Sequence, residues 1–184
     1  MALHVRTLDD PDLDDVDREF LENLARHDTV VVRVGSPNPT PDWAFTVGLH
    51  ARFDHPEVVI FGLRPETAHA ILNDLRDQVR TGTRFDAGMR TDALLEGMDC
   101  AFREVQDDWH YPFLGRMDWY YRGEHAPVLQ LFWPDREGRF PWDDGFDARF
   151  ADDQPLLYLD HPRPARAIAL LEEMELWPPR RRAD

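Results

Sequence analysis

Three short runs of β-branched and aromatic residues lie close together near the start of the chain, and they limit the possible folds more than any other feature. The runs span residues 29–34, 43–49 and 58–61. The connections between them are too short for helical crossovers, so they favour hairpins and a mixed or antiparallel sheet. Residues 65–80 then carry apolar side chains at helical spacing, starting at a proline suited to a first helical turn. Together these segments predict an α+β fold.

A first helix is expected near the N-terminus. Asp10 and Pro11 suit the N-cap and the first helical position. Apolar residues then recur at spacings of three and four along one face, namely Leu13, Val16, Phe20 and Leu24. The aspartates of the first turn would face the positive end of the helix dipole. The sequence therefore predicts a helix that packs one apolar face on the rest of the protein.

The second half of the chain predicts more strands and a final helix. Residues 100–105 and 128–133 are apolar runs of strand length, whereas the aromatic-rich residues 112–121 fit neither type of element. Residues 164–177 have an amphipathic helical pattern. We predict a single domain in residues 27–160, flanked by an N-terminal helix in 1–26 and by a C-terminal helix and basic tail in 161–184.

The composition argues against several classes of function. The net charge is −15, from 36 acidic and 21 basic residues, which disfavours binding to nucleic acid or to anionic membranes. Every basic residue is an arginine, so chemistry that needs a lysine, such as Schiff-base formation, is excluded. The chain has one cysteine, no apolar run long enough to span a bilayer and no recognisable secretory signal. We therefore expect a cytoplasmic protein.

The first candidate for a site is the end of the second strand-like run and the loop after it. Thr46 lies in the run, and His50 and His55 follow it. Imidazoles titrate near neutral pH and serve as bases or metal ligands, and loops at strand ends expose such groups. Histidines in a polar loop are also commonly just solvated, so both interpretations stay open.

The second candidate is the stretch over residues 129–147. It is dense in aromatic, proline, glycine and acidic residues, among them Trp133, Asp135, Trp142 and Asp143. Aromatic walls with a few placed carboxylates are typical of ligand pockets, but they also suit a rigid loop that covers one end of a core. Calcium-loop spacing counted from Asp143 lacks the required ligands, and no other metal-binding motif is present. The sequence predicts no metal site.

Several of these segments together resemble a known family. They are the run over residues 43–50, the His55-Pro56-Glu57 turn with the strand after it, the strand that ends in Trp133-Pro134-Asp135, and Phe140-Pro141-Trp142. This combination is similar to the domain-of-unknown-function family 4262, over roughly residues 27–157. The resemblance implies a small bacterial protein and transfers no catalytic residues.

Our leading hypothesis is a small-molecule site between the His50–His55 loop and residues 133–147, which requires both segments to meet at one rim of the sheet. Alternatives are a non-enzymatic acidic protein that binds a basic protein partner, and a metal-dependent hydrolase that uses His50 and His55. The strand order is also similar to the opening of flavin-binding split-barrel proteins. In that case FMN would contact Thr46, Arg64, Thr67 and Arg84.

Overall fold

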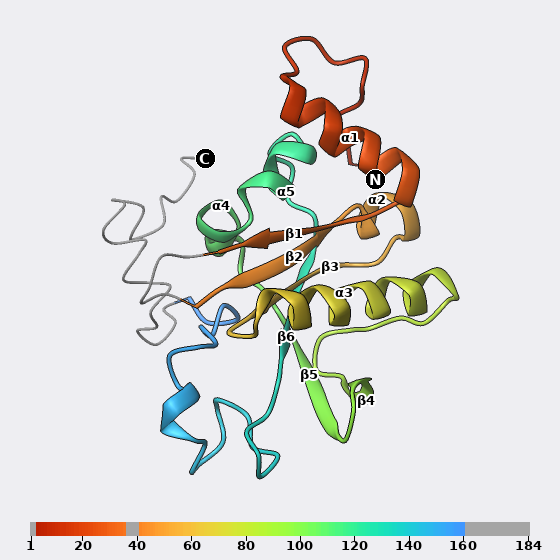
Figure 1. Ribbon diagram of the computed structural model, residues 1–184. Coiled ribbons are helices and arrows are strands. Elements are labelled where there is room, and N and C mark those ends of the chain that lie inside the picture. Colours follow the sequence, from red (N-terminus) through yellow and green to blue (C-terminus); the bar gives the residue numbers. More distant parts are fainter. Residues whose placement is uncertain (1–2, 36–40, 161–184) are drawn as a thin grey trace.

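A six-stranded mixed sheet forms the centre of the computed structural model, which describes residues 3–35 and 41–160 (Figure 1). The strands lie in the order β1-β2-β3-β6-β5-β4. All neighbours are antiparallel except the central pair, β3 and β6. Their bounds are β1 (Val30–Val34), β2 (Trp43–Val47), β3 (Glu57–Phe61), β4 (Arg90–Leu95), β5 (Met98–Glu104) and β6 (Val128–Phe132). The predicted α+β domain with a mixed sheet is confirmed. The sheet is open, so it does not form the split barrel that was considered as an alternative.

Helices cover both faces of this sheet. They are α1 (Asp15–His27), α2 (Leu49–Phe53), α3 (Pro65–Arg80), α4 (His110–Phe113) and α5 (Gly115–Tyr120), with short 3₁₀ turns η1 (Asp107–Trp109) and η2 (Ala148–Phe150). Helix α3 buries its apolar face on one side of the sheet, whereas α1, α4 and α5 form a second core on the other side. Within the described residues, no helix has the length and apolar composition needed to cross a bilayer.

Helix α3 has the predicted bounds, and α1 does not. The helix starts at Asp15 with Asp14 as its N-cap, whose carboxylate accepts a hydrogen bond of 2.7 Å from the Asp17 amide. It cannot start at Asp10, because Asp12 has a φ of 65°, outside the helical range. Val16, expected in the apolar face, is 61% exposed, because it lies in the first turn of the helix and the face that packs on the core carries Leu21 and Leu24.

Several elements escaped prediction. The chain turns at Gly48, which has a φ of 108°, so Leu49 opens helix α2 instead of extending β2. Strand β4 is mostly exposed and polar and carries little apolar pattern. The ambiguous residues 112–121 form the end of α4 and all of α5, and together with η1 before them they add buried aromatic side chains to the core beneath α1. The predicted helix over residues 164–177 and the basic tail lie outside the described residues.

The strand directions give the sheet two distinct ends. Because β2 and β5 run antiparallel to β3 and β6, the former pair ends where the latter pair begins. We call this end of the sheet the Glu57 end. We call the opposite end, where β3 and β6 finish, the Trp133 end. Figure 1 shows helix α2 and the chain after β6 at opposite ends of the strands.

Candidate functional site

The structure separates the two groups of residues that the sequence singled out. Thr46, His50 and His55 lie near the Glu57 end, whereas residues 133–147 leave β6 at the Trp133 end. The expectation that both segments meet at one rim is therefore wrong. The reason is strand direction. Strands β2 and β6 lie on either side of β3 and run in opposite directions, so the loops that follow them emerge at opposite ends of the strands.

At the Trp133 end, the predicted ligand-binding side chains hold the loop itself together. The Asp135 carboxylate is fully buried and accepts hydrogen bonds from the amides of Glu137, Arg139 and Asp147, and from Arg139 Nε at 2.9 Å. Burial alone would raise the pKa of Asp135, but these hydrogen bonds outweigh it and lower that pKa. This carboxylate therefore fixes a turn.

The other predicted residues of this segment also make protein contacts. Trp133 Nε1 donates to the Phe61 carbonyl at 2.8 Å, and Asp143 accepts from the Phe140 amide at 2.8 Å. Trp142 stacks on Phe140 with ring centroids 5.0 Å apart. These contacts favour the rigid covering loop over the pocket wall. A ligand role for Trp133, Asp135, Trp142 and Asp143 stays a prediction.

At the Glu57 end, one buried carboxylate organises the turn from β2 into α2. Glu57 has no exposed surface. Its Oε2 accepts from the Thr46 hydroxyl at 2.6 Å, and its Oε1 accepts from the amides of Gly48 and His50 and from the Tyr121 hydroxyl. Thr46 Oγ1 in turn accepts from the Val58 amide. Thr46, a candidate flavin contact, is thus engaged within the protein.

The tyrosine in this network is held in its protonated form. The Tyr121 hydroxyl lies 2.5 Å from Glu57 Oε1 and also accepts a hydrogen bond from the Ala51 amide. Burial, and then the neighbouring carboxylate, hold the pKa of Tyr121 well above its usual range. The sequence predicted Glu57 in a turn, and Tyr121 was not among the predicted site residues. Glu57 could have been recognised as a buried polar residue, because it is the single acid in the otherwise apolar strand β3.

The two histidines of the first candidate stretch differ in availability. His55 is buried, and its Nδ1 donates to the Pro56 carbonyl at 2.7 Å while its Nε2 accepts from the Phe85 amide at 2.9 Å. Burial lowers the pKa of His55. Both ring nitrogens are occupied, so binding a metal would break one of these bonds. His50 Nδ1 has no hydrogen-bond partner among the described residues, and the His50 ring meets Tyr121 edge-on.

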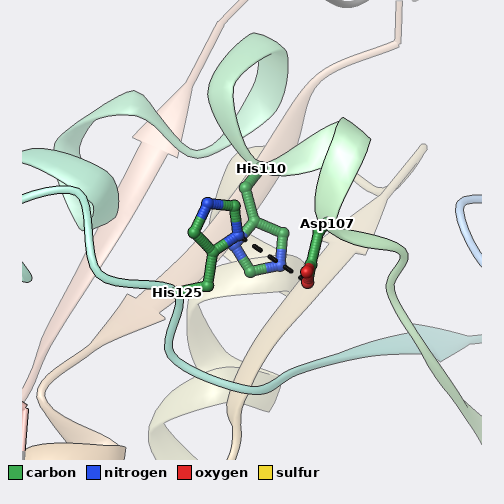
Figure 2. A group of neighbouring side chains, drawn as sticks. All are labelled: Asp107, His110 and His125. Carbon is green, nitrogen blue, oxygen red and sulfur yellow. Dashed lines mark ion pairs between the residues drawn. The ribbon is translucent and has the colours of Figure 1, made fainter. Parts of the chain in front are cut away.

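A different set of side chains forms the best candidate for a functional site. Asp107 in η1, His110 at the start of α4, and His125 in the segment before β6 point toward one another (Figure 2). One potential ligand atom from each residue lies within 4.8 Å of the other two. His125 Nδ1 is 3.7 Å from Asp107 Oδ1, and the two imidazole rings stack with centroids 4.9 Å apart.

The surrounding structure fixes one member of this cluster and leaves two accessible. Trp109 and Phe113 are buried on either side of His110, and Trp109 Nε1 donates to the Leu159 carbonyl at 2.9 Å. His110 itself is 1% exposed. By contrast, the side chains of Asp107 and His125 are 79% and 32% exposed. The cluster therefore has a rigid inner imidazole and an open outer side.

Electrostatics keep the inner imidazole neutral. Burial, and then the nearby His125, lower the pKa of His110 to about 4, although Asp107 acts in the opposite direction. His110 Nδ1 lies 3.9 Å from Asp118 Oδ1, which is too far for a hydrogen bond. Neutral imidazole is the form that binds metal ions.

This cluster was missed by the sequence analysis, which predicted no metal site. Asp107 and His110 are three residues apart, the spacing that puts two side chains on one side of a helical turn. That signal lay in a stretch with no clear helical or strand period. His125 comes from beyond α5, and nothing local in the sequence links it to the other two residues.

Fold and cluster define a class: a single α+β domain with an open mixed sheet and a two-histidine, one-carboxylate group at one end. Residues 23–147 match the domain-of-unknown-function family DUF4262, and the chain belongs to that family. The resemblance drawn from the sequence is confirmed. No curated protein and no solved structure matches the chain.

Proposed function

We propose that this protein binds a divalent transition-metal ion through Asp107, His110 and His125. The observation that carries the proposal is the convergence of the three side chains, with their potential ligand atoms all within 4.8 Å of one another. Two imidazoles and one carboxylate are a common protein ligand set for zinc and for iron(II). The metal-dependent function considered from the sequence thereby moves from His50 and His55 to a different set of residues.

The ligand types favour some metals over others. Magnesium and calcium prefer oxygen ligands, whereas imidazole suits zinc, iron, nickel and copper. At zinc–ligand bonds of about 2.0–2.1 Å, tetrahedral donors lie about 3.3 Å apart. The 3.7 Å between His125 and Asp107 is close to that separation. Only small movements of two exposed side chains would complete the geometry around the fixed His110.

An ion held by three protein ligands keeps at least one coordination position for water or a substrate oxygen. Structural zinc sites are closed by four protein ligands, whereas catalytic sites typically use three. The exposed side chains of Asp107 and His125 leave this position on the solvent side. Chemistry at such a centre would include polarisation of a bound carbonyl or phosphoryl oxygen.

Metal titration of untagged protein tests the proposal. Zinc, nickel and manganese would each be titrated in competition with a chromophoric chelator. We expect one zinc per chain, with affinity at least about tenfold weaker in His125→Gln and Asp107→Asn, because each loses a direct ligand. Matched control variants are His27→Gln and Asp99→Asn, which change exposed residues of the same types elsewhere. Unchanged affinity in both ligand variants, or no binding by the wild type, would overturn the proposal.

A further inference from the structure

A cavity of about 330 Å³ lies between the N-terminal segment, α1, α2 and Tyr120. Most of its wall is apolar and is formed by Val5, Leu8, Leu21, Leu24 and Ala25. The N-terminal segment that closes one side is anchored, because the Arg6 amide donates to the Tyr120 carbonyl at 2.9 Å and Arg6 Nε donates to the Trp119 carbonyl. The cavity shares no lining residue with the Asp107, His110 and His125 cluster.

The polar groups of the cavity include a hydroxyl without a protein partner. Tyr120 is 6% exposed, and its hydroxyl makes no hydrogen bond with any described residue. Burial raises the pKa of Tyr120, so this group is a protonated donor at neutral pH. The hydroxyl keeps some accessible surface of its own, so an acceptor atom of a ligand in the cavity can reach it.

A guanidinium stands close to that hydroxyl. Arg52 lines the same cavity, and its positive charge acts on the Tyr120 hydroxyl. The Arg52 side chain is 50% exposed, and its ion pair with Asp28 is long, at 3.9 Å. Most of its donors therefore remain available for a second acceptor. The Tyr120 hydroxyl is a neutral donor and Arg52 is a cation, and both lie beside the apolar wall of the cavity. Together they could bind one carboxylate group, while the apolar wall contacts the rest of the ligand.

We infer that this cavity binds a small monocarboxylate with an apolar body of about six to eight carbons. The size follows from the volume: the cavity holds about ten groups the size of a water molecule, each of which takes up roughly 30 Å³ in the liquid. The carboxylate accepts from Tyr120 and pairs with Arg52, and the hydrocarbon lies against the leucine and valine side chains. Two donor residues suit the two oxygens of a carboxylate.

The cation also selects against other ligand classes. An amine would be repelled by Arg52, and a neutral alcohol would use the hydroxyl without gaining an ion pair. The formal net charge of −15 disfavours approach of any anion from a distance, but that effect is screened beyond about 8 Å at physiological salt. The local guanidinium therefore decides the preference inside the cavity.

Calorimetric titration of the full chain with octanoate and with octan-1-ol tests the inference, because the two probes share a chain length and differ in charge. We expect octanoate to bind more tightly. Arg52→Gln should weaken octanoate about tenfold and leave octan-1-ol unchanged, because only the charge-assisted contact is lost. Ala25→Phe should fill the cavity and abolish binding of both probes. Arg26→Gln, an exposed arginine of α1, is the matched control and should bind as the wild type does.

Thermal unfolding of each variant separates loss of binding from loss of fold. Tyr120→Phe removes only the hydroxyl and supplies a second, milder variant, which should weaken octanoate while the melting temperature stays near that of the wild type. The inference is overturned if the wild type binds neither probe, or binds both equally. It is also overturned if a folded Ala25→Phe variant still binds octanoate with wild-type affinity.

Discussion

Lowering the pH from 7 to 4 should destabilise the fold through the imidazole of His110. In the folded protein its pKa lies at about 4, whereas the ordinary value is 6.5. As the pH falls, the unfolded chain takes up a proton first, so stability is complete above about pH 6.5 and falls as the pH drops toward about 4. At about 1.4 kcal/mol for each pH unit, the difference between 6.5 and about 4 corresponds to about 3 kcal/mol.

Urea unfolding of the wild type and of His110→Gln measures this contribution. The free energy of unfolding would be determined at pH 7, 5.5 and 4 in the presence of a chelator, so that no metal ion contributes. Glutamine does not titrate, so the variant should lose about 3 kcal/mol less than the wild type between pH 7 and 4. His69→Gln changes an exposed histidine and should keep the wild-type pH dependence. Parallel pH profiles for the wild type and His110→Gln would refute the reasoning.

Three further substitutions address the packing of the two ends of the sheet. Glu57→Gln should cost about 2–3 kcal/mol in urea unfolding, because one amide cannot accept from all four donors, whereas the exposed Glu96→Gln should cost little. Gly48→Ala should be more destabilising than Gly88→Ala by urea unfolding: both have positive φ, but only at Gly48 would a Cβ meet a backbone oxygen, at 2.6 Å. Asp135→Asn should speed tryptic cleavage within residues 136–139, and equal cleavage rates would argue against its role in fixing the turn.

Much of the fold follows from local patterns along the chain. The apolar period of α3 predicted its bounds and its buried residues, because one face of that helix rests on the sheet over its whole length. The β-branched runs located β1, β2 and β3 for a similar reason. Prediction failed where local pattern was weak, as in the polar edge strand β4, and where a single residue conformation mattered, as at Asp12.

The site was harder to predict than the fold, because it depends on strand direction. Residues after β2 and residues after β6 look equivalent in the sequence, since both follow an apolar strand and carry polar and aromatic groups. Because β2 is antiparallel to β3 and β6 is parallel to it, these two groups of residues lie at opposite ends of the strands. Asp107, His110 and His125 meet for the same kind of reason, since β5 ends beside the start of β6.

Some hypotheses from the sequence stay predictions. A basic protein partner rests on the net charge alone. The FMN alternative loses its architectural ground, because the sheet is open and Arg84, one of its candidate contacts, donates to the Asp54 carbonyl and to Asp86.

The parallel pairing of β3 with β6 has a consequence for biosynthesis. The ribosome releases β1, β2 and β3 well before β6, and the β4–β5 hairpin must also emerge before the centre of the sheet can close. Until then the nascent chain exposes an unpaired edge of β3, whose side chains are apolar except for Glu57, and such an edge is an aggregation hazard. Truncated chains that stop before Val128 should therefore depend on chaperones, whereas chains that include Phe132 can complete their own sheet.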